Sequence, residues 1–404
     1  MNLLQKYVSI KRTSLAKPKA DGPGDRMLDL HQHWQNTLNA LNLDLKTAEQ
    51  ALHATPDITC YGGWSFQSSI LKTPWQDWPA CFLFIPRWEL RCHHHHYELC
   101  LNLKGPQAHW QQQVQRACKE LQQPLTAHDP LPLFQDLQHQ PDYSNWAQGV
   151  KSAQYLFQHG QLDKLVLSRE SSTVLDALPL KVMHNLLSQQ REAYHFWLQI
   201  DTQQVLWGAS PERLFARQNQ SLFTEALAGT RPRPPDLEQQ HIFQQELLHS
   251  HKEFEENERV RQHLEHALLP LVSALQAEPL RVIPAGPVQH LYRCMQAKLK
   301  SGVSHAELVS VLHPTPAVSG FPSHAAVQHI QELESHCRGW YTGAIGWMSG
   351  TSCEWSVVLR CALWRQQSLY FYSGAGIMPA SEPQQEWDEL NVKLESLLNL
   401  WQDL

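Results

Sequence analysis

The sequence predicts an α+β fold with a large, mostly antiparallel sheet, and two observations support this prediction. Short apolar, strand-like runs follow one another through turn residues, in a strand–turn–strand order without regular βαβ units. Segments with apolar residues at helical spacing interrupt these runs, so helices and strands share the chain. The 404 residues are 42% hydrophobic, which is enough for one large domain or two ordinary ones with a substantial core.

Residues 1–141 are rich in Gln, His, Trp and Pro and hold no group of residues that we can connect to chemistry, so we expect scaffold. Two apolar runs, residues 81–85 and 99–103, are expected to be paired strands, with Pro86 at an edge or a bend. Between them lies the run His93 to His96. Adjacent side chains on a strand point to opposite faces, so these four histidines cannot all bind one metal ion, and we expect no metal site there.

Residues 142–404 show a clearer succession of elements. The first is a helix with Ser144 as a plausible N-cap and Gly160 at its end. The expected strands are residues 164–168, 194–200, 205–208, 221–227, 341–348, 354–363 and 369–372. The expected helices are an amphipathic one over residues 180–190, a long one over 235–275, shorter ones after Pro287, and a C-terminal one from Pro383. A rigid turn rich in Pro and Gly covers residues 313–322.

The charge and the cysteines exclude several kinds of protein. The formal net charge is −6 and the basic residues are dispersed, so we do not expect a nucleic-acid partner. No apolar run approaches the roughly 18 residues of a membrane span, and Met1 to Lys6 lack the layout of a secretory signal, so we expect a cytoplasmic protein. Nine cysteines without a Cys-x-x-Cys pair indicate neither a disulfide framework nor a thiolate zinc site.

Two pairs of glutamates, Glu253 with Glu256 and Glu386 with Glu389, lie on predicted helices on either side of a strand-rich stretch. The two carboxylates of each pair leave the same helix face, because residues three apart are neighbours on a helix. Mg²⁺ is typically bound by one or two carboxylates together with water and substrate oxygens. The pairs therefore indicate a carboxylate cage for a hard divalent cation, although Glu-rich helices are also typical of solvated surface.

The segment Gly374-Ala-Gly376 follows the last predicted strand. Met378 and Pro379 come next, so the third glycine and the helix of a dinucleotide-binding motif are missing. Glycines at the end of a strand let a ligand approach backbone N–H groups, which suit an anionic oxygen. A substrate that carries a carboxylate is therefore expected rather than a dinucleotide.

A series of motifs stands between residues 144 and 404. They are Lys164-Leu-Val-Leu-Ser-Arg169, Gly208-Ala-Ser-Pro-Glu-Arg-Leu214, Thr224-Glu-Ala-Leu-Ala-Gly-Thr230, Lys252-Glu-Phe-Glu-Glu-Asn257, His313-Pro-Thr-Pro-Ala-Val-Ser-Gly320, Leu359-Arg-Cys361, Gly374-Ala-Gly-Ile377 and Glu386-Trp-Asp-Glu389 with Lys393. Together and in this order they resemble the chorismate-utilising enzymes, which include isochorismate, salicylate, anthranilate and aminodeoxychorismate synthases. The resemblance implies a single α+β domain of two large antiparallel sheets packed face to face, with helices outside and the site between the sheets. Residues 142–404 would be the catalytic, chorismate-binding region, and residues 1–141 a scaffold part of the same fold.

Three positions place the chain within this family. Isochorismate synthases resemble it in having a lysine at Lys164, where anthranilate synthases generally do not. Aminodeoxychorismate synthases carry a lysine in the segment around Ala228, and salicylate and anthranilate synthases usually have threonine at Ala317. The resemblance therefore implies an isochorismate synthase, and residues 224–230 look more like the menaquinone-pathway enzymes than the siderophore ones. The alternatives are a salicylate synthase, a siderophore-pathway isochorismate synthase and a non-catalytic carboxylate or metal binder.

The resemblance also implies roles for individual residues. Lys164 would be the base that activates water for addition at C2 of chorismate, which requires a lowered pKa, and Glu212 the acid that protonates the leaving C4 hydroxyl. Glu256 and Glu386 would bind Mg²⁺, with Glu253 and Glu389 as further or water-mediated ligands. The implied substrate-binding residues are Thr230, His313, Ala317, Tyr341, Leu359, Arg360, Gly374, Gly376 and Lys393.

Several of these residues also have simpler interpretations. Lys164 alone could protect a strand edge, Glu212 alone could be a turn residue, and Lys393 could form an i,i+4 ion pair with Glu389. His313 precedes a proline in a tight turn and is either a positioning residue or a structural one. Asn257 stands where several family members have histidine. For the oligomeric state, a monomer is favoured.

Overall fold

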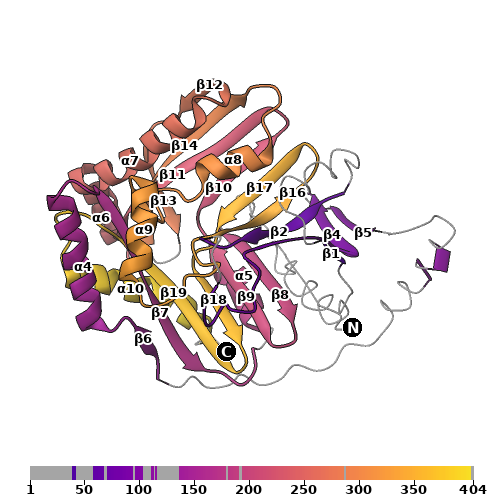
Figure 1. The fold of residues 1–404 in the computed structure, drawn as a ribbon, viewed down its shortest axis with the longest axis horizontal. Helices are drawn as coiled ribbons and strands as arrows, with labels where there is room; N and C mark the ends of the chain where they lie inside the picture. Colours follow the sequence, from indigo (N-terminus) through magenta and orange to yellow (C-terminus); the bar gives the residue numbers. More distant parts are fainter. Residues whose placement is uncertain are drawn as a thin grey trace.

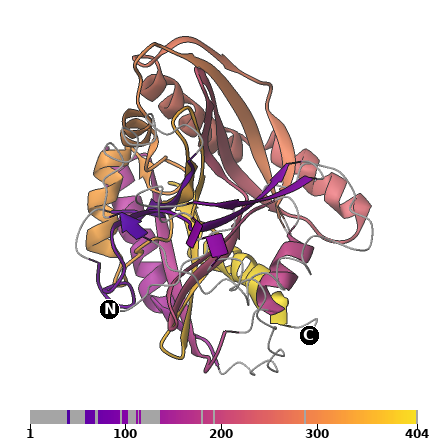
Figure 2. The same ribbon diagram turned by 90° about the vertical axis from the view of Figure 1, so that its right-hand side faces the viewer.

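The structure is a computed structural model that describes most of the chain after residue 135 and parts of the chain before it. The described residues are 39–41, 58–67, 71–93, 96–102, 111–112, 114–115, 136–178, 181–190, 193–285 and 288–401. They form two large antiparallel sheets and a two-stranded sheet, with helices on the outside (Figure 1, Figure 2). The predicted α+β class is therefore confirmed. None of the described helices is both long and apolar enough to cross a membrane.

The larger sheet combines N-terminal strands with strands from the second half of the chain. In spatial order these are β1 (Asn39–Leu41), β3 (Cys81–Ile85), β2 (Cys60–Trp64), β16 (Ala344–Met348), β17 (Ser352–Val357), β10 (Arg213–Gln218), β11 (Ser221–Pro232), β14 (Val288–Leu299) and β12 (Val272–Ala277), and β13 (Arg281–Ala285) also pairs with β14. Because β2 pairs with β16 along its whole length, residues 60–64 continue the sheet of the C-terminal region (Figure 1).

The smaller sheet is built mainly from strands after residue 160. In spatial order these are β15 (Gly320–Phe321), β7 (Lys164–Val174), β19 (Ser368–Ile377), β18 (Cys361–Arg365), β9 (Gln204–Ser210) and β8 (Tyr194–Asp201), and β6 (Gln138–Gln140) also pairs with β7. Two more strands, β4 (Trp88–His93) and β5 (His96–Leu101), pair only with each other. The histidine run thus spans the end of β4 and the start of β5, and residues 94 and 95 lie outside the described residues.

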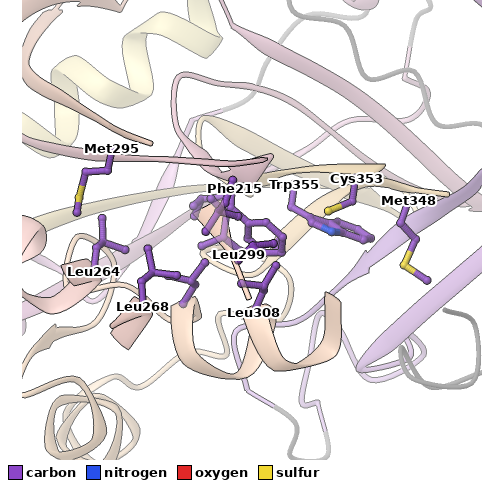
Figure 3. Packing of buried hydrophobic residues seen from close by; sticks show 14 of the residues in the cluster. Phe215, Leu264, Leu268, Met295, Leu299, Leu308, Met348, Cys353 and Trp355 are labelled. Carbon is purple, nitrogen blue, oxygen red and sulfur yellow. The ribbon is translucent and has the colours of Figure 1, made fainter. Parts of the chain in front are cut away.

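Helices and side-chain clusters hold the two sheets together. The helices are α4 (Tyr143–Gln158), α5 (Lys181–Gln189), α6 (Leu237–His249), α7 (His251–Leu268), α8 (His305–Leu312), α9 (Ser323–Leu333) and α10 (Pro383–Leu398), followed by the 3-10 turn η2 (Asn399–Trp401). Figure 3 shows the core under the larger sheet, where Phe215 and Trp355 lie near Leu308 of α8. Phe84 of the larger sheet and Phe196 of the smaller one share another buried cluster, as expected for sheets packed face to face.

Two N-terminal details of the prediction are wrong. Residues 81–85 do form a strand, β3, but it pairs with β1 and β2, whereas β5 pairs with β4. Helix α4 is capped by Asp142 and not by Ser144, because Asp142 Oδ1 accepts a hydrogen bond from the backbone N–H of Asn145 at 2.9 Å. Asp142 lies just before the first helical residue, the position from which a side chain reaches the unpaired N–H groups.

Three predicted elements after residue 230 also differ. The long helix over residues 235–275 is two helices and a strand, because the backbone of Ser250 is extended, ending α6 and capping α7, and β12 begins at Val272. The short helices predicted after Pro287 are replaced up to residue 299 by the long strand β14. The strand predicted over residues 354–363 is divided into β17 and β18 by residues 358–360, where Arg360 has a φ of 46°.

Candidate active site

A cavity lies at the junction of both large sheets with helices α7 and α10. It encloses about 900 Å³, its open mouth included. All the predicted site residues except Lys164 and His313 line it, namely Glu212, Thr230, Glu253, Glu256, Ala317, Tyr341, Leu359, Arg360, Gly374, Gly376, Glu386, Glu389 and Lys393. The fold therefore brings to one place residues that the sequence spreads from Glu212 to Lys393.

Lys164 lies directly behind the wall of this cavity. It is the first residue of β7, and its side chain is fully buried. Its Nζ is 2.7 Å from Glu256 Oε1, and Glu256 faces the cavity. A Cβ atom at Gly376 would lie 2.7 Å from Glu256 Oε1 and 3.0 Å from Lys164 Cε. The missing side chain at Gly376 thus leaves the space in which this ion pair forms, at the edge of the cavity.

Glu212 reaches the cavity from the connection between β9 and β10, and it is 4% exposed. Burial and repulsion from the nearby Glu225 carboxylate raise the pKa of Glu212 to about 8, although the charge of Lys164 acts in the opposite direction. Glu225 is itself oriented by the backbone N–H of Arg213, which donates to Glu225 Oε1 at 2.6 Å. Glu212 is therefore mostly protonated at neutral pH and can donate a proton into the cavity.

The glutamates of the two acidic pairs share the cavity, and each contacts a basic side chain. The N···O distances are 2.6 Å for Glu253 with Arg231, 2.7 Å for Glu256 with Lys164, 3.3 Å for Glu386 with Lys252 and 2.5 Å for Glu389 with Lys393. Within the described part of the chain, no group of three or more acidic, histidine or cysteine side chains has the arrangement of a formed metal site.

The charges of these carboxyl groups nevertheless suit a hard divalent cation. Burial and the neighbouring Glu256 raise the pKa of Glu253, and burial and Glu389 raise the pKa of Glu386. Carboxyl groups that repel one another in this way gain from a shared cation, and oxygen is the ligand that Mg²⁺ prefers. Lys252, the partner of Glu386, has a side chain that is 39% exposed and is free to turn toward solvent. The donor set therefore fits Mg²⁺.

The pKa of Glu256 is shifted in the opposite direction to the pKa values of Glu212, Glu253 and Glu386. Burial acts to raise its pKa, but the Lys164 ammonium group beside it outweighs burial, and the pKa of Glu256 is lowered. Glu256 is therefore held ionised in a buried place. It is available both as the partner of Lys164 and as a charged oxygen ligand.

Another part of the wall carries groups that suit a carboxylate. Arg360 is 8% exposed and lies with Tyr341 along the cavity. Lys393 donates from Nζ to the backbone O of Gly374 at 2.9 Å. The Tyr341 hydroxyl lies close to Gly374, 2.7 Å from where a Cβ atom of this residue would be. A planar guanidinium and a phenol hydroxyl in one cavity can both donate to the oxygens of a carboxylate.

His313 lies behind the cavity rather than in its wall. Its Nε2 is 3.0 Å from the backbone O of Thr342, and its ring packs edge-on against Trp64 and Phe66. Burial lowers the pKa of His313 to about 4, so the ring is neutral at pH 7. Since Thr342 lines the cavity, His313 is connected to the wall through that residue's backbone.

The sequence analysis did not identify His290, which lines the cavity from β14. Its Nδ1 is 3.0 Å from Thr230 Oγ1, and burial, aided by the charges of Arg360 and Lys393, lowers its pKa to about 3. It is therefore a neutral imidazole that can hydrogen bond to a ligand. The signal was a lone histidine among mixed apolar and polar residues, and it could not be used because residues 288–299 were expected to be helical.

Residues 7–402 match the family described as chorismate binding enzyme. The chain belongs to this family. Over 271 residues it is 35% identical to isochorismate synthase MenF of Escherichia coli K12, covering 66% of the chain and 62% of MenF. Over 265 residues it is 36% identical to isochorismate synthase EntC of the same organism, covering 65% of the chain and 68% of EntC. The sequence alignment with MenF thus spans less than two thirds of that relative.

A solved structure extends this likeness over nearly the whole chain. It is described as MenF, the menaquinone-specific isochorismate synthase from Escherichia coli, and it matches with a TM-score of 0.81 at 26% identity. The match covers 99% of this chain and 96% of the other. The predicted family and the predicted chorismate-utilising fold are therefore confirmed.

Proposed function

We propose that the protein is an isochorismate synthase that converts chorismate to isochorismate with Mg²⁺. The observation that carries the proposal is the cavity, which places a protonated carboxyl group, Glu212, and the Lys164–Glu256 ion pair around one space. The likeness to MenF and EntC, both isochorismate synthases, supports the same reaction. A protein that only binds carboxylates or metal ions has no need of a proton donor in its cavity.

The reaction needs one group that gives a proton and another that takes one. Water adds at C2 of chorismate while the C4 hydroxyl leaves and the double bonds shift. Hydroxide is a poor leaving group, so Glu212, with its raised pKa, would donate a proton to the C4 oxygen. Lys164 would be the base that takes the proton from the attacking water. After the reaction Lys164 would release its proton to solvent, and Glu212 would take up a proton from solvent.

The other cavity residues would hold the substrate. We assign the enolpyruvyl carboxylate to Arg360 and Tyr341, and the ring region to Thr230, Ala317 and Leu359, all of which line the cavity. Backbone N–H groups at Gly374 and Gly376 and the Lys393 ammonium group would add hydrogen bonds and positive charge. His313 would position the backbone of Thr342 rather than touch the substrate.

The acidic residues would hold the cation. Glu256 and Glu386 would be its ligands, with Glu253 and Glu389 beside them. When bound, Mg²⁺ supplies charge neutralisation for the ring carboxylate of the substrate. Lys252 would have to leave Glu386, and its partly exposed side chain permits this.

A product assay tests the proposal. Purified protein is incubated with chorismate and Mg²⁺, and chorismate, isochorismate, salicylate and pyruvate are separated by chromatography. Isochorismate with little pyruvate is the expected result. Salicylate and pyruvate formed in step with chorismate consumption would instead show a salicylate synthase, and unchanged chorismate would show a non-catalytic binder.

We further propose that the enzyme works in menaquinone biosynthesis, in the cytoplasm and as a monomer, with residues 1–141 as a scaffold part of the fold. The segment 224–230 and the whole-chain match to menaquinone-specific MenF support the pathway. The 33% identity to a vibriobactin-specific isochorismate synthase of Vibrio cholerae, near the 35% identity to MenF, supports the siderophore alternative. Restoring menaquinone in bacteria that lack their own menaquinone-specific isochorismate synthase, but not siderophore in those that lack the other, would separate the two.

A further inference from the structure

Residues 71–80 pack against the cavity wall from behind, although they lie in the part of the chain where we expected only scaffold. Trp75 is fully buried in a cluster with Trp78, Trp340, Tyr341 and Tyr372. Its ring lies edge-on to Trp78 with centroids 5.4 Å apart, and at 5.7 Å from the ring of Tyr372. Tyr341 and Tyr372 belong to this cluster and also line the cavity.

Tyr372 is held by two hydrogen bonds at its hydroxyl group. The indole N–H of Trp75 donates to Tyr372 Oη at 2.9 Å, and the Tyr372 hydroxyl donates to Glu170 Oε2, also at 2.9 Å. Burial raises the pKa of Glu170 to about 7, even though the hydrogen bond from Tyr372 opposes this. A ring with its hydroxyl fixed at both the donor and the acceptor side has one orientation in the wall.

The orientation of Tyr372 passes directly to Tyr341. The two rings are stacked, with centroids 5.4 Å apart and planes only 19° apart. Tyr341 cannot tilt relative to Tyr372 without losing this stacking contact. The hydroxyl group of Tyr341 lies over Gly374. The position of the Tyr341 hydroxyl, one of the groups proposed to hold the substrate carboxylate, therefore depends on Tyr372.

The contact between residues 71–80 and the wall is specific. Gly339, two residues before Tyr341, has a left-handed φ of 53°, and a Cβ atom there would lie 2.2 Å from the ring of Trp75. The indole N–H of Trp340 donates to the backbone O of Pro79 at 2.9 Å. Asp77 forms an ion pair with Arg365 of β18. These contacts hold Trp75 against the segment that carries Tyr341.

We propose that Trp75 is a positioning residue of the active site, which acts on substrate binding through Tyr372 and Tyr341. Residues 71–80 thus support the cavity wall from behind in addition to supporting the fold. This inference rests on the proposed function, because it assigns the substrate carboxylate to Tyr341.

The test compares Trp75→Phe with Trp78→Phe. Both variants remove one indole ring from the same cluster, but the Trp78 indole N–H has no hydrogen-bond partner among the described residues, so only Trp75→Phe removes a hydrogen bond. Kd for chorismate, measured by calorimetry, and KM should rise about fivefold in Trp75→Phe relative to Trp78→Phe, the effect of losing one buried hydrogen bond. Because the contact acts on bound substrate and transition state alike, kcat should stay within about twofold.

A double-mutant cycle with Tyr341→Phe decides whether the effect passes through Tyr341. If it does, Trp75→Phe adds little to KM once the Tyr341 hydroxyl is gone. Equal KM values in Trp75→Phe and Trp78→Phe, or effects of Trp75→Phe and Tyr341→Phe that multiply in full, would overturn the inference and leave the proposed function intact. A wild-type protein that does not bind chorismate would remove both.

Discussion

Glu212 and Glu256 are residues of one type that face one cavity, and their surroundings shift their pKa values in opposite directions. Glu212 has the Glu225 carboxylate near it, and burial raises its pKa to about 8. Glu256 is mostly buried, with 14% of its side chain exposed, but Lys164 lies 2.7 Å away and lowers its pKa. Burial disfavours the charged form at both places, so the neighbour decides the outcome.

This difference separates a proton donor from a charged partner. A protonated carboxyl group can act as a general acid, and an ionised one can pair with a lysine or a cation. Glu212 is thereby suited to the leaving hydroxyl and Glu256 to the charged side of the cavity. Substitutions at Lys164, Glu212 and Glu256 each remove one of these two glutamates or the lysine that keeps Glu256 ionised.

Loss of Lys164 should have the largest effect. Lys164→Ala removes both the proposed base and the partner that keeps Glu256 ionised, so we expect kcat to fall by about 10³-fold or more. Chorismate binding should change much less, because a base acts mainly in the transition state. Turnover is measured by isochorismate formation and binding by calorimetry. Unchanged turnover would remove Lys164 from the mechanism.

Replacement of Glu212 should cost about 10²- to 10³-fold in kcat, since Glu212→Gln keeps the shape but cannot donate an acidic proton. The matched control is Glu255→Gln, which removes a half-exposed carboxylate from α7 with His251 as its ion-pair partner. The control should retain the turnover of the parent. Equal turnover in Glu212→Gln and the control would show that the acid lies elsewhere.

The titration of Glu212 should make the stability of the fold depend on pH, which can be measured without an activity assay. Its folded pKa is raised, so between about pH 4.5 and pH 8 the unfolded chain loses this proton while the folded protein keeps it. The group therefore lowers the free energy of unfolding as pH rises through this window. We expect the Tm of Glu212→Gln, relative to the parent, to be higher at pH 8 than at pH 5. A constant difference in Tm would mean that Glu212 is ionised in the folded protein.

Replacement of Glu256 should raise the Mg²⁺ concentration needed for half-maximal activity by about tenfold, because Glu256→Gln removes a charged oxygen from a site that has few protein ligands. The Mg²⁺ concentration at half-maximal activity, and Mg²⁺ binding followed by calorimetry, give this value. Glu386→Gln should act in the same direction, whereas Glu255→Gln should not, since Glu255 lies on the same helix but is exposed. Saturation of all three variants at the same Mg²⁺ concentration would argue against direct ligation.

The sequence predicted the residues of this cavity better than their charge states. The family resemblance identified Glu212, the spacing of an acidic pair together with the resemblance identified Glu256, and strands such as β7 and β8 were recognisable from continuous apolar runs. The pairing of Lys164 with Glu256 depends on the register of β7 with β19 and on the packing of α7, which no local pattern encodes. Long-range contacts of this kind decide pKa values, so the physical cause of the opposite pKa shifts of the two glutamates became visible only in three dimensions.

Elements were missed for a related reason. The apolar residues of β14 do not alternate strictly with polar ones, because Leu291 with Tyr292 and Cys294 with Met295 are adjacent, so a helix was equally compatible with its pattern. The Glu-rich sequence of α7, which precedes β14 in the chain, concealed the break between helices α6 and α7 at Ser250. Because β14 was missed, so was His290, whose neutral ring faces the cavity.

The smallest expected effect concerns Ala317, which lines the cavity. Its side chain is uncharged, so it does not contribute to the opposite pKa shifts of Glu212 and Glu256. Ala317→Thr adds a hydroxyl group and a methyl group, which can shift bound isochorismate relative to Glu212 and make pyruvate elimination accessible at some cost to isomerisation. We expect a few per cent of the product as salicylate. This corresponds to a barrier for pyruvate elimination that lies on the order of 2–3 kcal/mol above the barrier for release of isochorismate. Ala317→Ser, which adds the hydroxyl group without the methyl group, separates the two causes. Pyruvate release by the parent protein in step with chorismate consumption would show that alanine at this position does not prevent elimination, and a salicylate synthase would then replace the proposed enzyme.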